Sequence, residues 1–202
     1  MQKPFAYLLG GVLGMIVLRQ LFTSSEAQAE ELPAGNDVDP DYQEKAGTTY
    51  KPGSAEQVRL FEKAAEIADL PTQWASDTSF HKLLAAESGG RVGIPNFLWA
   101  KWLGVSQQKM RSTPSLWPKV WKVLRDGKAK PSYTGISSHA AGLGQLQPAA
   151  MKDYQPSGVQ GVGIPVEEAV GMLRYVKSRY GTPAKAWASW KANEASDGYG
   201  WY

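Results

Sequence analysis

The stretch that decides the fold class is residues 54–90, SAEQVRLFEKAAEIADLPTQWASDTSFHKLLAAESGG. It opens on a capping box, because Ser54 and Gln57 stand three residues apart, where their side chains can satisfy backbone N–H groups at a helix start. Apolar side chains then recur with helical spacing, at Val58, Phe61, Ala65 and Ala68. This pattern predicts an amphipathic helix that begins just after Ser54.

A second helix is predicted in the rest of that stretch. It begins near residues 76–78 and carries Phe80, Leu84 and Glu87 on one face. It ends at Ser88-Gly89-Gly90, because glycine readily adopts the left-handed conformation that closes a helix. Glu87 is therefore expected to face apolar neighbours in the last turn, where burial and the helix dipole both disfavour its negative charge. A raised pKa would keep a proton available for donation. The alternative is an exposed glutamate at a helix end.

Helix signals recur farther along the chain, whereas no segment shows the alternation typical of a strand. Pro165 suits the first turn of a helix that Gly181 closes. Thr182-Pro183 predicts a cap and first turn for a further helix, and the segment 115–125 carries another apolar stripe. We therefore expect a mainly α-helical domain over residues 54–202.

The composition limits the chemistry open to this chain of 202 residues. It has no cysteine, which excludes disulfides, thiol nucleophiles and cysteine-based zinc sites. Because it also has only two histidines, we expect neither a metal nor a cofactor. The formal charge of +3 is too balanced to favour nucleic acid as a partner. Eight Trp and nine Tyr offer flat apolar surfaces that suit sugar rings. Catalysis must then use carboxylates, hydroxyls or amides.

The amino terminus predicts a membrane anchor in residues 1–22. Residues 4–22 are uncharged apart from one arginine that can snorkel to the interface, and their length approaches that of a membrane-spanning helix. Gly10 and Gly14 form a GxxxG pattern that permits helix self-association. Positive charge before the run and acids after it place the following domain on the non-cytoplasmic side. A cleavable signal peptide ending at Ala27-Gln28-Ala29 is the alternative.

Residues 23–53 predict a flexible acidic linker. They are rich in Ser, Ala, Glu, Asp, Gly and Pro and hold few large apolar side chains, so they cannot bury enough surface to fold alone. Such a tether would connect the anchor to the helical domain.

Three short motifs lie in order on the predicted helices and loops. They are AESGG at residues 86–90, SSHAAGLGQ at 137–145 and AWASW at 186–190. Together they resemble the lytic transglycosylase family of lysozyme-like enzymes, of the soluble lytic transglycosylase type. The ending Gly200-Trp201-Tyr202 is similar to endings of phage and actinobacterial members. The resemblance covers residues from about 56 to 202 and implies a lysozyme-like helical domain.

The resemblance implies a role for each motif residue. Glu87 would be the catalytic acid and base, and the substrate-binding residues would be Ser88, Ser138, Gln145 and Trp190. Gln145 would hydrogen-bond the bound sugar, and Ser138 would contact its N-acetyl group or order the loop. Trp190 stands where the family usually has tyrosine, so stacking is kept while the hydrogen bond of a phenol is lost.

The family's activity implies cleavage of the bond between N-acetylmuramic acid and N-acetylglucosamine in peptidoglycan. Glu87 would protonate the glycosidic oxygen and then take the proton of the muramoyl C6 hydroxyl, which closes a 1,6-anhydro ring. One carboxyl suffices for this reaction, whereas most hydrolytic glycosidases use two. Asp126 and Asp153 are the nearest candidates for a second carboxylate, and neither stands in a motif.

The leading interpretation is a membrane-anchored or virion-associated lytic transglycosylase for local wall opening, by a phage or a cell-envelope machine. Two alternatives stay open. One is a hydrolytic lysozyme on the same fold, and the other is a non-catalytic peptidoglycan-binding assembly protein.

The gap between the first two motifs is longer than the family's by about one helical hairpin. Residues 101–130 within it hold eight basic residues and one acid. The inserted segment also carries four tryptophans, Trp99, Trp102, Trp117 and Trp121. We expect a peripheral hairpin whose tryptophans fill a small core of its own. A cleft wall that binds extra sugars or anionic polymers is the alternative.

Overall fold

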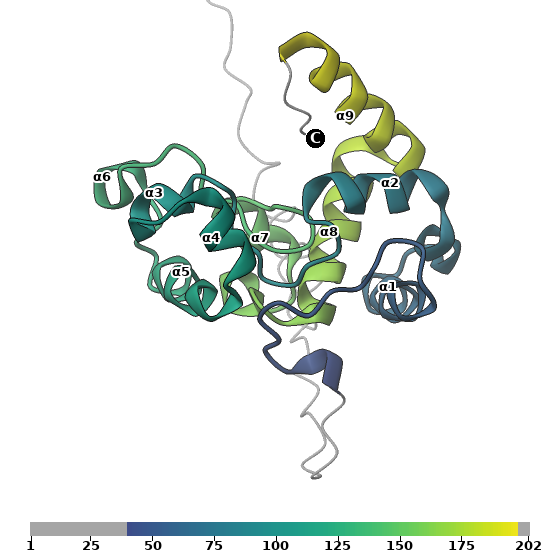
Figure 1. Ribbon diagram of the computed structural model, residues 1–202. Helices are drawn as coiled ribbons and strands as arrows, with labels where there is room; N and C mark the ends of the chain where they lie inside the picture. Colours follow the sequence, from purple (N-terminus) through teal and green to yellow (C-terminus); the bar gives the residue numbers. More distant parts are fainter. Residues whose placement is uncertain (1–39, 198–202) are drawn as a thin grey trace, which may run out of the picture. The chain divides into compact units, whose positions relative to one another are not determined.

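The computed structural model describes residues 40–197 and shows a mainly α-helical chain (Figure 1). Within this range the only β pairings are isolated bridges, with no named strand. The helices, with η for a 3-10 helix, are in chain order η1 Pro40–Tyr42, α1 Ala55–Ala68, η2 Thr72–Ser76, α2 Thr78–Glu87, α3 Trp99–Leu103, α4 Gln107–Ser112, η3 Pro114–Leu116, α5 Trp117–Arg125, α6 Pro131–Thr134, α7 Pro148–Tyr154, η4 Gly158–Gly161, α8 Pro165–Tyr180 and α9 Pro183–Asp197.

The predicted starts of α1 and α2 are confirmed. The Ser54 hydroxyl accepts a hydrogen bond from the Gln57 backbone N–H at 3.2 Å. The Gln57 side chain in turn accepts from the N–H of Gly53 at 2.9 Å, one residue earlier than in a standard capping box. At α2 the cap is Asp77, whose carboxylate accepts from two N–H groups of the first turn. Local capping chemistry thus sets where both helices begin.

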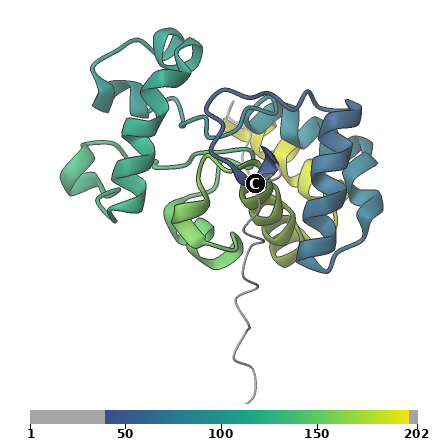
Figure 2. The same cartoon turned by 90° about the horizontal axis from the view of Figure 1, so that it is seen from below.

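The first of two hydrophobic clusters is built from α1, α2, α8 and the start of α9. Phe61 on α1 and Phe80 on α2 are fully buried and meet edge to face, with ring centroids 4.8 Å apart. Helix α8 runs from Pro165 to the Gly181 cap, as predicted, and packs against α1 on one side and α7 on the other (Figure 2). The predicted apolar stripe of α8 is buried along its length, at Val166, Ala169, Val170, Leu173 and Val176.

A second cluster forms around three tryptophans of the inserted segment. Trp99, Trp117 and Trp121 are almost fully buried. Trp117 donates its indole N–H to a backbone oxygen of α4, and Trp121 donates to the loop after α2, both at 2.8 Å. The prediction that the four tryptophans are core residues is confirmed for these three, whereas Trp102 is only partly buried against the cluster. The cluster is not confined to the insertion, however, because Met151 of α7 and Val162 also belong to it.

The insertion is more than the predicted hairpin. It contains the short helices α3, α4, α5 and α6 in place of two longer ones. Gly104 and Gly135 end α3 and α6 in the left-handed conformation, with φ of 66° and 68°. Pro114 stands directly after Thr113, the C-cap of α4, and lacks the N–H that would continue the helix. Residues that end helices therefore divide this segment into several short helices.

Residues 40–53 contact the helical domain, so the predicted linker does not extend to residue 53. Tyr50 is only 7% exposed and belongs to the first cluster. Its N–H donates to the carbonyl of Gly90 at 2.8 Å, and the N–H of Lys45 donates to the carbonyl of Gly163, also at 2.8 Å. These partners lie far away in the sequence, so the polar composition of the segment did not reveal them.

The predicted anchor, residues 1–22, lies outside the described residues, as do the predicted linker up to residue 39 and the ending 198–202. Among the helices of residues 40–197, none combines the length and apolar character needed to cross a membrane.

Candidate active site

Glu87 is the last residue of α2, and its side chain is partly buried. Its Oε1 atom is buried and has no hydrogen-bond partner within the part of the chain that the structure describes. Burial raises the pKa of Glu87 to about 8, and a hydrogen bond with the Trp190 side chain acts in the opposite direction. At neutral pH the carboxyl group therefore keeps its proton, as expected of a general acid.

The contact between Glu87 and Trp190 comes from the packing of α2 on α9. Trp190 is partly buried and stacks on Trp187 one turn earlier, with ring centroids 5.2 Å apart and planes 13° from parallel. An indole N–H can only donate a hydrogen bond, so its contact with the Glu87 carboxyl favours the ionised form. Burial has the larger effect, and the carboxyl therefore keeps its proton at neutral pH. The structure thus brings two of the sequence-predicted site residues together.

Ser88 is only 1% exposed, and its hydroxyl bonds to backbone groups. Its Oγ accepts from the N–H of Gly90 at 3.1 Å and donates to the carbonyl of Leu84 at 3.4 Å. Gly90 has a φ of 75°, and a side chain there would collide with the carbonyl oxygen of Tyr50. In this structure Ser88 therefore orders the turn that follows Glu87.

Gln145 closes a loop that lies against the segment after α2. Its side-chain Nε2 donates to the carbonyls of Ile94, at 2.9 Å, and Gly142, at 3.0 Å. The residue itself has a φ of 47°, a conformation that non-glycine residues rarely adopt. Such strain is often found where a side chain must be held in one orientation. With Nε2 engaged, the amide oxygen is the part of the side chain that remains as a hydrogen-bond acceptor.

Glu168 on α8 holds the loops of this region together, and the sequence motifs did not single it out. Its carboxylate is 1% exposed and accepts hydrogen bonds from the N–H groups of Gly93 at 3.1 Å, Leu143 at 2.9 Å and Gly163 at 2.7 Å. Burial raises the pKa of Glu168 to about 7, and the three N–H donors oppose this effect. Glu168 lies off the apolar stripe of α8, so helical periodicity gave no signal that could have identified it.

Gly142 shows how closely this carboxylate is packed. A Cβ atom at Gly142 would lie 2.7 Å from the carboxyl carbon of Glu168, and the residue has a φ of 82°. Only glycine fits there. Residues 142–145, which end the second motif, are thus held in position by a buried glutamate more than twenty residues later in the chain.

Ser138 is partly buried, and its side chain bonds to the start of α7. Its Oγ accepts a hydrogen bond from Gln147 at 2.8 Å. The neighbouring His139 is buried, contacts the Thr134 hydroxyl at 2.7 Å and meets the Trp99 ring edge to face. No described interaction joins Ser138 to Glu87, and its predicted substrate contact stays a prediction.

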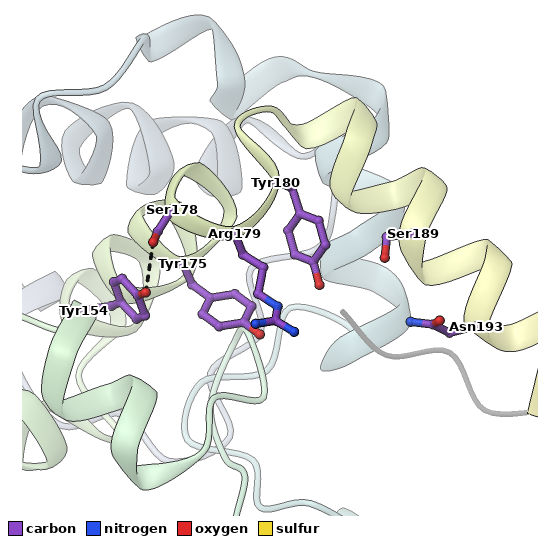
Figure 3. A pocket seen from close by; sticks show the side chains of 7 residues that line it. All are labelled: Tyr154, Tyr175, Ser178, Arg179, Tyr180, Ser189 and Asn193. Carbon is purple, nitrogen blue, oxygen red and sulfur yellow. Dashed lines mark hydrogen bonds between the residues drawn. The ribbon is translucent and has the colours of Figure 1, made fainter.

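A pocket of about 780 Å³ opens between α8 and α9, with one wall residue from α7 (Figure 3). Its lining combines aromatic and polar groups: Tyr154, Tyr175, Ser178, Arg179, Tyr180, Ser189 and Asn193. The charge of Glu87 contributes to the raised pKa of Tyr175, behind the larger effect of burial. Glu87 itself does not line the pocket, but the wall residue Ser189 directly precedes Trp190, the partner of Glu87, so the pocket lies near the carboxyl. The sequence motifs missed it, because its residues come from three separate helices.

Across residues 40–197, no three His, Cys, Asp or Glu side chains gather where they could hold a metal ion. A scan against protein-family models and searches of curated proteins and of solved structures found no match to this chain.

Proposed function

We propose that the chain is a peptidoglycan lytic transglycosylase with a lysozyme-like helical domain. The observation that carries the proposal is the buried carboxyl of Glu87, whose pKa of about 8 keeps it protonated at neutral pH. It lies at the end of α2, beside a pocket rich in tyrosine. A protonated carboxyl next to an aromatic pocket is the arrangement that acid-catalysed glycoside cleavage requires.

In the proposed reaction Glu87 donates its proton to the glycosidic oxygen between the two sugars. The bond to the muramoyl C1 breaks, and positive charge develops on that ring. The Glu87 carboxylate then removes the proton of the C6 hydroxyl of the same muramoyl unit, whose oxygen bonds to C1. The 1,6-anhydro product forms without water, and Glu87 ends the cycle protonated as it began.

The surroundings of the other two acids considered support a mechanism with one carboxyl. Asp126 lies at the end of α5 and pairs with Lys122 at 3.2 Å and Lys128 at 3.6 Å. Asp153 is exposed on α7. Neither residue is held in the buried setting of Glu87. A hydrolytic lysozyme, which typically uses two carboxylates, is the second enzymatic candidate.

We also propose that residues 4–22 anchor the protein in a membrane, with Gly10 and Gly14 available for helix self-association. The helical domain would then act on the wall side of a cell membrane or at a virion membrane. Anchoring confines cleavage of glycan strands to one place, which suits local wall opening by a phage or an envelope machine.

The proposed activity is tested by incubating purified peptidoglycan with the full chain and measuring the masses of the released muropeptides by mass spectrometry. We expect products with 1,6-anhydro ends, which are lighter by one water than the hydrolysis products. Reducing ends in their place would show hydrolysis and refute the transglycosylase. Intact sacculi that still bind the protein would indicate the non-catalytic assembly protein.

A further inference from the structure

The pocket beside Glu87 is suited to an anion. Arg179 is its only charged lining residue, and no acid is among the seven residues that line it. The Arg179 side chain is exposed, and it has no acidic partner among the residues that the structure describes. A guanidinium group offers paired N–H donors that match the two oxygens of a carboxylate. Arg179 thus gives the pocket a positive charge that no neighbouring acid neutralises and a guanidinium group that can bind an anion in a defined direction.

Neighbouring phenols flank this guanidinium at the pocket. Its hydrogen bond with Tyr180 raises the pKa of Arg179, and the charges of Tyr175 and Tyr180 act in the same direction. Figure 3 shows the Arg179 side chain extending beside the Tyr175 ring, with Tyr180 on its other side.

The remaining lining suits a sugar ring. Tyr175 meets Tyr154 edge to face at 5.6 Å between centroids and Tyr180 at 6.4 Å, so three rings form a connected aromatic wall. Ser189 and Asn193 face them from α9 with groups that can bond to hydroxyls or an N-acetyl group (Figure 3). A volume of about 780 Å³ accommodates a substituted sugar of one to two rings.

We propose that this pocket binds an N-acetylmuramoyl unit and that Arg179 pairs with its carboxylate, so that Arg179 selects carboxylate-bearing sugars over uncharged N-acetylglucosamine. The inference rests on the proposed function, because it assigns the substrate unit that lies next to Glu87. The carboxylate has two sources: the lactyl group of the sugar itself, or the peptide attached to that group. The same guanidinium serves either one.

The inference is tested by NMR titration of the full chain with three probes: N-acetylmuramic acid, an N-acetylmuramoyl dipeptide and N-acetylglucosamine. We expect the wild type to bind at least one carboxylated probe more tightly than N-acetylglucosamine. Arg179→Gln should weaken that binding about tenfold, in line with the loss of one charge-assisted contact. It should leave N-acetylglucosamine binding unchanged. Lys177→Gln is the matched control, because it removes one positive charge from the same end of α8 outside the pocket.

Each outcome of the titration decides one question. Tighter binding of N-acetylmuramic acid identifies the lactyl carboxylate as the source, and tighter binding of the dipeptide alone identifies the peptide. Equal binding of all three probes by the wild type, or unchanged binding by Arg179→Gln, overturns the inference. Because binding is read without turnover, this result is separable from the proposed activity. Cleavage of the wall by a protein that fails the titration would leave the activity standing and the pocket assignment refuted.

Discussion

Glu87→Gln is expected to lower the rate of peptidoglycan cleavage by about a thousandfold, within the range that positioned acids contribute. Glutamine has nearly the shape of a protonated glutamic acid, and it too is neutral, so it fits the buried end of α2 without adding a charge. It cannot donate the proton that the leaving oxygen needs. The measurement is the rate of release of soluble muropeptides by equal amounts of folded wild type and variant.

Glu62→Gln is the matched control for this comparison. It makes the same chemical change on the exposed face of α1 and should leave the rate unchanged. Binding of sacculi should also survive in Glu87→Gln. A Glu87→Gln protein that retains more than about a tenth of the wild-type rate, where an intact acid should be worth a factor of 10² or more, would remove Glu87 from the mechanism.

Glu168→Ala should produce the second large effect, a loss of stability. The substitution leaves the buried N–H groups of Gly93, Leu143 and Gly163 without their acceptor. Each unsatisfied group costs about 1–3 kcal/mol, so the sum is a large share of a typical stability of about 5–15 kcal/mol. We expect the unfolding temperature to fall by about 10 °C or more. Differential scanning calorimetry of the two proteins measures the change.

Glu168→Gln keeps the calorimetric test informative if the alanine variant does not fold. One carboxyl oxygen accepts two of the three N–H groups, and the glutamine oxygen can retain those two. The amide NH₂ group of glutamine then faces the N–H of Gly163, and because both are donors this one hydrogen bond is lost. The Glu168→Gln variant should therefore unfold at a temperature between those of wild type and Glu168→Ala. An alanine variant that unfolds within about 2 °C of wild type would show that the carboxylate does not hold these loops.

Much of the helical framework could be predicted from the sequence because its signals are local. The capping serine before α1, the Gly-Gly that follows α2 and the Pro–Gly pair that bounds α8 each act within one helical turn. The apolar stripe on α2 placed Glu87 among buried neighbours for the same reason. Burial of that stripe was the physical basis for expecting a raised pKa.

The features that the sequence did not reveal depend on contacts between distant segments. Tyr50 is buried because its backbone pairs with Gly90, although the composition around it is that of a linker. Glu168 stands in an ordinary helical pattern, and its partners lie in three different loops. The pocket is assembled from α7, α8 and α9, whose tyrosines carry no motif. Periodicity and capping contain no information on such pairings.

The Glu87 carboxyl is expected to keep its proton at neutral pH, and its titration can be followed directly. In protein labelled with ¹³C at the glutamate carboxyl carbons, the chemical shift of each signal reports its protonation from pH 4 to 10. The Glu87 signal is the one that disappears in Glu87→Gln, which separates it from that of Glu168. The raised pKa predicts a midpoint of about 8, with the acid form, and activity with it, lost as the pH rises through that value. A midpoint near the ordinary 4.5 would contradict the assignment of Glu87 as the proton donor.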